Sequence, residues 1–201
     1  MAFLGLDLSL TSTGIVILSK SGALLHSSAY GYGLKKAGTD DEIKRLLDIT
    51  NRIESVVSEF PIECVGIEDY AYRRAGSGSQ ITRQAELTGV VKTTLYQYRL
   101  KIFVVGISQG RKITFECPVG VSNAERKEGM DIKTKVMELV KTKYGLDFET
   151  TDEADAFVLA EAVRKLIVPG NPSPEALKEL QKLERRQKGA PIIKKGGKRG
   201  K

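Results

Sequence analysis

Four acidic side chains lie where a globular chain rarely places a charge. Asp7 stands inside the apolar run FLGLDLSL, Glu68 follows ECVGI, and Asp152 and Asp155 occur in the helix-like segment TDEADAFVLAEAVRKL. Carboxylates are seldom buried unless they are hydrogen-bonded, paired or bound to a cation. Hard oxygen ligands from separate elements are typical of Mg²⁺ or Mn²⁺ sites that also bind phosphate oxygens. The pattern therefore favours a divalent-metal nuclease.

Such a site requires no covalent nucleophile from the protein. Two cations held by shared carboxylates can activate water and stabilise the leaving 3′ oxygen during in-line phosphodiester cleavage. The single histidine, His26, lies in the apparent strand ALLHSSAY, and we interpret it as structural. For Asp7 or Glu68 taken alone, a buried acid bonded to backbone amides is an alternative.

The elements that must position these acids follow a regular order. Three apolar runs, AFLGLDLS, GIVILSK and ALLHSSAYGY, are separated by turn residues and predict an antiparallel meander. Apolar periodicity predicts a helix over residues 41–60, which the strand IECVGIE follows, and a second helix over 80–98, which the strand KIFVVGI follows. Residues 108–130 show no clear periodicity, and helices are predicted over 131–144 and from Thr150 or Thr151 to about Val168. The nuclease part thus has the order βββαβαβα.

The last of these helices places its acids by periodicity. Asp152 and Asp155 are three residues apart and share a face that continues with apolar residues, so Asp155 is expected to point towards the core. Thr150 and Glu153 fit a capping box, and acids in the first turn suit the helix dipole. Capping explains Glu153 and Asp152 but not Asp155.

Length and charge indicate one folded unit with an extension. The chain has 201 residues and a net charge of +7, which is enough for one sizeable core. Residues 171–201 hold 10 basic and 3 acidic side chains and carry the whole excess. We predict a nuclease domain over residues 1–168 and a basic extension over 169–201, with an exposed helix in PEALKELQKLERRQK and a disordered end. Such a tail binds phosphates non-specifically, with a solubilising role as the alternative.

The remaining sequence features concern location. No apolar run approaches the roughly 20 residues of a membrane helix. Cys64 and Cys117 lack metal-ligand spacing and suit a reducing compartment, with Cys64 as core filler. We predict a cytoplasmic protein with no membrane partner and no small-molecule cofactor.

Taken together, the motifs resemble those of a known family. GLDLSLTSTG near the start, a strand ending in IED before aromatic residues, the helical SQITRQAELTGVV and a late DEADAFVLA have the order and spacing of RuvC-type Holliday junction resolvases. The resemblance extends over most of residues 1–168. It implies an RNase H-like α/β fold, with a mixed five-stranded sheet flanked by helices. It also implies a homodimer that resolves four-way DNA junctions by paired symmetric nicks, with two Mg²⁺ or Mn²⁺ ions in each active site.

The resemblance assigns roles to individual residues. The family's four acidic metal ligands match Asp7, Glu68, Asp152 and Asp155, and its basic residue near the phosphate matches Lys133, with Lys135 as the neighbouring alternative. Aromatic residues after the second acid stack near the junction centre, for which strand packing is an equal alternative. Arginines beside the Gly-rich AGSGS suggest a mobile loop that closes on phosphates, for which a plain solvated loop is the alternative. The predicted DNA-binding residues are Tyr70, Tyr72, Arg73, Arg74, Arg83, Arg111, Lys112, Lys133 and Lys135.

The chain departs from the family pattern between Gly106 and Met130. The segment SQGRKITFECPVGVSNAERKEG, with Arg111 and Lys112, replaces a short glycine-rich connection. This difference predicts altered junction contacts and, with the basic tail, points to a divergent, phage-encoded member that acts in the host cytoplasm or nucleoid.

Three other functions are compatible with part of the pattern. An RNase H-type hybrid nuclease would share the fold and metals, but no motif identifies contacts to 2′-hydroxyl groups. An actin-like ATP-binding protein is suggested by DLSLTSTG, although that fold needs two such domains and a longer chain. A catalytically inert architectural DNA-binding protein is the third, and the intact set of acids argues against it.

Overall fold

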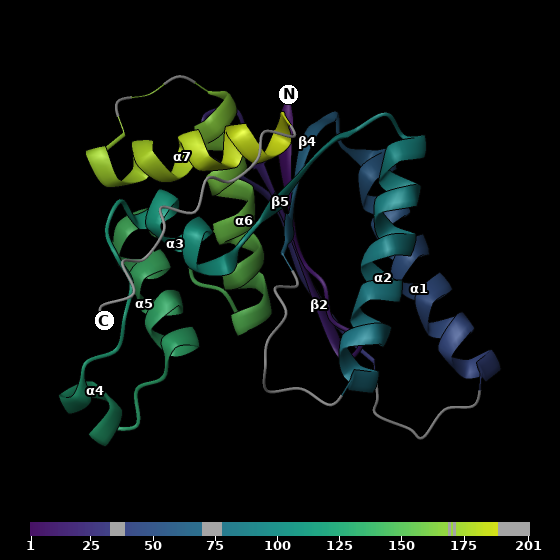
Figure 1. Cartoon of the computed structure of the whole chain (residues 1–201), viewed down its shortest axis with the longest axis horizontal. Coiled ribbons are helices and arrows are strands. Elements are labelled where there is room, and N and C mark those ends of the chain that lie inside the picture. The colour runs from purple at the N-terminus through teal and green to yellow at the C-terminus, as the bar shows by residue number, and fades with distance from the viewer. Residues whose placement is uncertain (33–38, 70–77, 169, 171, 189–201) are drawn as a thin grey trace, which may run out of the picture.

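A five-stranded sheet lies at the centre of the computed structural model (Figure 1), which describes all residues except 33–38, 70–77, 169, 171 and 189–201. The strand order is β3-β2-β1-β4-β5. Antiparallel pairs join β1 to β2 and β2 to β3, whereas β4 is parallel to both β1 and β5. The predicted meander and mixed sheet are confirmed. The strands are β1 (Ala2–Asp7), β2 (Ser12–Ser19), β3 (Leu24–Gly31), β4 (Ile62–Glu68) and β5 (Lys101–Val105).

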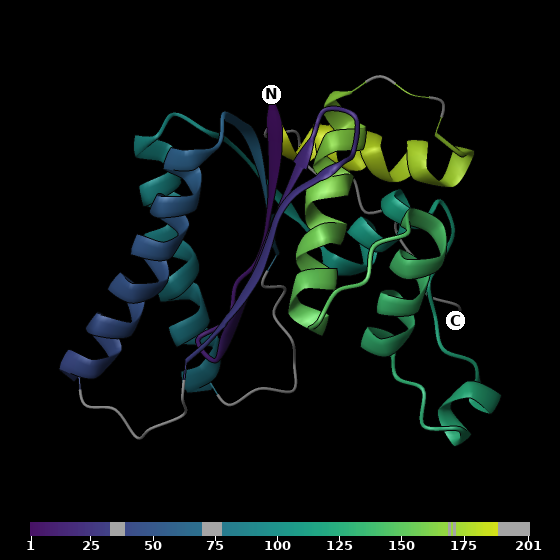
Figure 2. The same ribbon diagram turned by 180° about the vertical axis from the view of Figure 1, so that it is seen from behind.

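Helices cover both faces of the sheet, as Figure 2 shows from behind. On one face lie α1 (Thr39–Glu59) and α2 (Gly78–Gln97). On the other face, α6 (Thr151–Ile167) contacts β1, β2 and β4. Three helices pack around α6, and a short helix projects beyond them. These are α3 (Ile107–Phe115), α5 (Ile132–Tyr144) and α7 (Pro174–Gln187), with α4 (Asn123–Lys127) as the short one.

Side chains of the central strands alternate between the two faces of the sheet. Leu4, Leu6 and Ile15 pack in the core beneath α1 and α2. Phe3 and Val16 point to the opposite face, into cores shared with α6. Because β1 is buried on both faces, its register is strongly specified, and a slip of one residue would turn every side chain to the wrong face. This alternation fixes which face of the sheet carries the acid at the end of β1.

Strand glycines allow α6 to lie directly on the sheet. A Cβ atom at Gly5 would be 2.0 Å from the carbonyl oxygen of Ala156. At Gly14, a Cβ atom would be 2.1 Å from the carbonyl oxygen of Asp152. Gly66 on β4 makes a third close approach, 2.6 Å from the α6 backbone. The absence of side chains at these positions therefore brings the start of α6 against the ends of β1 and β2.

The segment between β5 and α5 is more regular than its sequence indicates. Residues 108–130, where the sequence shows no clear periodicity, contain α4 and all of α3 except its first residue. The buried side of α3 includes Gly110 and Arg111 as well as apolar residues. Because these two buried positions of α3 do not carry large apolar residues, its sequence shows only weak helical periodicity of apolar side chains.

The helix in the C-terminal extension is docked rather than exposed, contrary to the prediction. It buries Ala176, Leu180 and Leu183, the two leucines in the core that contains β5 and α3 residues. At its end, Gln187 Nε2 donates a hydrogen bond of 2.9 Å to the carbonyl oxygen of Ile102 on the edge strand. The division between 1–168 and 169–201 stays a prediction, and the predicted disordered end lies largely outside the described residues.

His26 and Cys64, which we interpreted as structural residues, both lie within strands of the sheet. His26 Nε2 on β3 is 2.8 Å from Ser28 Oγ, and its ring contacts Phe60. Cys64 is buried within β4. No helix in the described part of the chain is long and apolar enough to cross a membrane.

Candidate active site

Two of the predicted acids end neighbouring parallel strands. Asp7 is the last residue of β1 and Glu68 the last residue of β4. The register pairs Leu6 with Ile67, so the two acids follow side by side at the same edge of the sheet. Both lie two residues after a glycine that contacts α6, and side chains two apart share a face. Both acids are therefore on the α6 face.

The other two acids come from the beginning of α6. Thr150 caps this helix, and Glu153 completes the capping box that the sequence predicts. Ser27 Oγ also donates a hydrogen bond to the Glu153 carboxylate, which explains why this residue is buried without a role at the site. Asp155 is 4% exposed, as its helix face predicts, and Asp152 is partly exposed above it.

The surroundings of Asp7 disfavour its ionised form. Its side chain is buried, and burial, followed by the negative charges of Asp155 and Glu68, raises its pKa to about 8. Asp152 raises this pKa further, while Lys133 lowers it. Because Asp7 interacts with all three other carboxylates, the structure brings the four predicted acids into one electrostatic environment.

Lys133 in the first turn of α5 faces these acids. Its Nζ lies 3.3 Å from Asp152 Oδ1 and 4.0 Å from Asp155 Oδ2. Burial lowers the pKa of Lys133, but the neighbouring carboxylates outweigh this effect and raise the pKa above its usual range. The alternative residue, Lys135, instead lies 2.6 Å from Glu125. The geometry thus distinguishes two lysines that the sequence leaves as neighbours.

Arg111 belongs to the acidic cluster, although the sequence did not predict this contact. It was predicted as a DNA contact in an irregular insertion, but it is buried on α3, where its Nη2 lies 2.9 Å from Asp155 Oδ1. Its Nε is buried without a partner in the described structure. A signal was available, since Arg111 lies four residues after Ile107 and four before Phe115, on the inner side of a helix. Arg111 is therefore buried against the carboxylate of Asp155 and is not a surface residue.

The donor atoms suit a divalent cation, although their arrangement is not that of a metal-bound site. Within the described residues, no three His, Cys, Asp or Glu side chains are placed to hold one ion. Lys133 and Arg111 are instead paired with the two acids of α6. The chemistry fits a hard dication, because three elements supply carboxylates. Burial raises the pKa of Asp7, and the negative charges of Asp155 and Glu68 raise it further. Cation binding therefore requires the ammonium group of Lys133 to move away from these carboxylates, while the buried Arg111 can stay against Asp155.

Comparison with known proteins decides the family. The family described as crossover junction endodeoxyribonuclease RuvC matches residues 3–163. The chain belongs to the RuvC family. A crossover junction endodeoxyribonuclease RuvC from Ruegeria pomeroyi is 30% identical over 161 residues, which cover 80% of this chain and 88% of the relative. The predicted family and enzyme class are confirmed.

Solved RuvC structures share the fold of this family member. The T. thermophilus RuvC in complex with Holliday junction substrate has a TM-score of 0.62 at 18% identity, covering 80% of this chain and 91% of that one. A second Thermus thermophilus RuvC structure has a TM-score of 0.60 at 19% identity, covering 80% and 92%. These likenesses confirm the RNase H-like α/β fold. The RuvC match ends at residue 163, so α7 lies beyond it.

The other predicted DNA-binding residues of this RuvC-family chain either pair with carboxylates outside the acidic cluster or lie outside the described residues. Arg83 on α2 is 56% exposed and pairs with Glu42 of α1 at 2.7 Å. Lys112 on α3 lies 3.8 Å from Glu179 of α7. Four further candidates, Tyr70, Tyr72, Arg73 and Arg74, lie outside the described residues.

Proposed function

We propose that this protein is a Mg²⁺- or Mn²⁺-dependent endonuclease that resolves four-way DNA junctions by paired symmetric nicks. The observation that carries the proposal is the burial of Asp7 among three other carboxylates at the edge of the sheet, beside Lys133. Membership of the RuvC family supports the reaction class. A four-way junction as substrate is supported by the relative solved in complex with Holliday junction substrate.

The four acids would hold two divalent cations in each active site. Asp7 and Glu68 offer oxygens from the sheet, and Asp152 and Asp155 offer oxygens from α6. When bound, the ions supply an activated water and charge stabilisation for the leaving 3′ oxygen. The buried position of Asp7 lowers the local dielectric response, which strengthens its attraction for a cation.

Two basic side chains have different roles in this proposal. The side chain of Lys133 is 46% exposed, so its ammonium group can leave Asp152 and offset the charge of a bound phosphate. The Arg111 side chain is only 11% exposed and stays against Asp155. Arg111 is therefore a positioning residue for that carboxylate, and Lys133 is the residue that contacts DNA.

Paired nicks require two active sites on one junction. A homodimer supplies them, one for each of two opposed strands, and makes the two cuts equivalent by symmetry. We place this reaction in the cytoplasm, where the junctions of the chromosome or of an infecting phage are formed.

The decisive experiment compares substrates and metals. Purified protein and its Asp7→Asn variant are incubated with a labelled four-way junction, a linear duplex and an RNA–DNA hybrid, in Mg²⁺, Mn²⁺ or EDTA. We expect symmetric junction nicks that need a metal and disappear in the variant, while junction binding is preserved. Preferential cutting of the hybrid would assign the chain to RNase H activity. Tight junction binding without cleavage under either metal would support the inert architectural function.

A further inference from the structure

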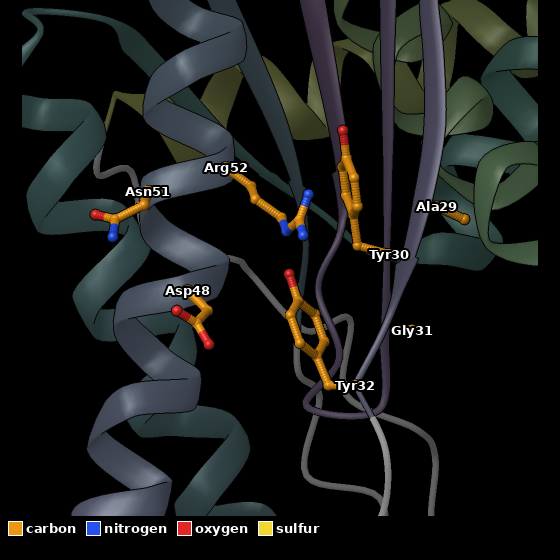
Figure 3. A pocket seen from close by; sticks show the side chains of 7 residues that line it. All are labelled: Ala29, Tyr30, Gly31, Tyr32, Asp48, Asn51 and Arg52. Atoms are coloured by element: carbon orange, nitrogen blue, oxygen red, sulfur yellow. The ribbon is translucent and has the colours of Figure 1, made fainter.

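A pocket lies between the end of β3 and the middle of α1. Its volume is about 500 Å³, within the usual range for sites that bind small molecules or single residues of a polymer. Figure 3 shows the side chains of Tyr30 and Tyr32 on the strand side and of Asp48, Asn51 and Arg52 on the helix side. The pocket therefore combines two aromatic rings with a cation and a carboxylate, while the amide of Asn51 points away from the rings.

One polar group of this pocket, the hydroxyl of Tyr32, has no polar partner within the described residues. The hydroxyl oxygen of Tyr32 is buried and makes no hydrogen bond within the described part of the chain. Burial raises the pKa of Tyr32 although Arg52 lowers it, so this hydroxyl remains a hydrogen-bond donor. A buried hydroxyl without a partner costs free energy, and a ligand that accepts its hydrogen bond removes that cost.

Arg52 is arranged for stacking rather than for an ion pair. Its guanidinium carbon lies 4.3 Å from the centre of the Tyr30 ring. No ion pair between Arg52 and a carboxylate occurs within the described residues. Arg52 is an exposed residue that lines the pocket, so a ligand in the pocket can reach its side chain. Guanidinium planes and aromatic rings are the surfaces on which unpaired nucleobases stack.

The pocket lies at the same edge of the sheet as the acids, on the opposite face. β3 runs in the direction of β1, because both are antiparallel to β2. Gly14 of β2 pairs with Asp7, and the preceding residue, Thr13, pairs with Tyr30. Two strand spacings, roughly 10 Å, separate β3 from β1. A DNA strand that crosses this edge can thus reach both places within a few nucleotides.

We propose that this pocket holds one unpaired base of the DNA strand next to the cleaved phosphodiester, which rests on the proposed function for DNA as the substrate. The base stacks on the guanidinium of Arg52, with Tyr30 behind it. Its ring nitrogen or carbonyl oxygen accepts the hydrogen bond of Tyr32, and its exocyclic amine donates to Asp48. A phosphate group fits this set less well, because the carboxylate of Asp48 repels it.

The test measures single-strand binding without metal or cleavage. The full chain in EDTA is titrated against two fluorescent single-stranded oligonucleotides of equal length and charge, one normal and one wholly abasic. The variants are Arg52→Ala, Arg52→Lys and Tyr32→Phe, with Lys44→Ala as the control because Lys44 is another exposed cation of α1. We expect Arg52→Ala to weaken binding of the normal strand about tenfold, as loss of one stacked base does. Tyr32→Phe should weaken it about threefold, as loss of one hydrogen bond does.

Each further result supports or overturns the base-binding pocket. Arg52→Ala should weaken binding of the abasic strand no more than Lys44→Ala does. Arg52→Lys should bind the normal strand with an affinity between those of Arg52→Ala and the wild type, because lysine keeps the positive charge but lacks the planar guanidinium group. Equal weakening of both strands by Arg52→Ala would show phosphate binding and overturn the proposal, as would a normal strand that responds equally to Arg52→Ala and Lys44→Ala. The binding assay contains no junction and no metal, so its result is independent of the cleavage assay. If the protein binds single strands in an Arg52-dependent way but cuts no junction, the resolvase function is rejected and the base-binding pocket is retained.

Discussion

At the scale of residues, the charges of the proposed active site compensate one another only in part. Lys133 lies within 4.0 Å of both acids of α6, and Arg111 is paired with one of them. Within the part of the chain that the structure describes, Asp7 forms no such ion pair, and burial together with three neighbouring acids raises its pKa to about 8. Ionised Asp7 therefore destabilises the metal-free fold, and the same excess of negative charge provides affinity for a divalent cation.

This balance predicts a stabilising but inactivating substitution. We expect Asp7→Asn to raise the free energy of unfolding of the metal-free protein by about 1–3 kcal/mol at pH 8, because it removes a buried charge. A carboxyl with a pKa of about 8 in the folded state and about 4 in the unfolded chain stabilises the fold below pH 4 and loses that contribution as the pH rises towards 8. The gain should thus shrink towards pH 5.

Thermal unfolding in EDTA at the two pH values measures this effect. Each kcal/mol corresponds to about 2–4 °C in a domain of this size. The control is Asp147→Asn, because the Asp147 side chain is 71% exposed and its ion pair contributes little. Added Mg²⁺ should raise the melting temperature of the wild type more than that of Asp7→Asn. A variant that melts below the wild type at pH 8 would contradict the assignment of Asp7 as an uncompensated charge.

The two lysines of α5 supply a second prediction at this scale. Lys133→Met should lower the cleavage rate about 10²-fold at saturating substrate, the usual loss when one group that stabilises transition-state charge is removed. Lys135→Met should change it by less than about threefold, because Lys135 is paired with Glu125. Single-turnover cleavage of a labelled junction measures both. Equal losses in the two variants would mean that general basicity of α5, rather than contact with the acids, matters.

At the scale of elements, the sequence predicts those whose signals are local. The strands and α1, α2, α5 and α6 follow from alternation and helical periodicity, and the capping box at Thr150 was predicted correctly. α3 was missed because its inner side carries Arg111, whose partner Asp155 lies 44 residues later in the chain. α7 was predicted as a helix but not as a docked one, since its apolar face gives no information about the surface that it covers. Both features depend on contacts between segments far apart in the chain, which local sequence patterns do not reveal.

The contact between α6 and the sheet yields a prediction about one glycine. Gly14→Ala should destabilise the fold by roughly 1–3 kcal/mol, the usual cost of overpacking, and should impair cleavage, because its Cβ would press on the backbone of Asp152. Gly89→Ala on α2 is the control, since its Cβ would meet nothing within 4 Å and alanine favours a helix. Thermal unfolding and cleavage are compared for both variants. Full cleavage activity in Gly14→Ala would show that the site tolerates displacement of the first turn of α6.

At the scale of the whole molecule, the C-terminal extension contains two parts with different physical roles. The family match ends at residue 163, and α7 then returns to cover the edge strand β5. Arg186 of α7 lies 3.2 Å from Asp69, the residue after Glu68. Beyond α7, residues 189–201 carry 5 basic and no acidic side chains. The docked helix thus belongs to the fold that holds the active site, whereas the basic end supplies charge.

Two truncations separate these roles. Removal of residues 189–201 should leave the melting temperature and the cleavage rate at saturating protein unchanged and should weaken junction binding. The dependence of log affinity on log salt should become shallower by about 0.9 for each phosphate that the shortened chain no longer neutralises. Removal of 171–201 should in addition lower the melting temperature, because it uncovers the core in which Leu180 and Leu183 are buried. Fluorescence anisotropy over a salt series and thermal unfolding distinguish the two cases. An unchanged salt slope in the shorter truncation would mean that the basic end does not touch DNA and acts only as a solubilising segment.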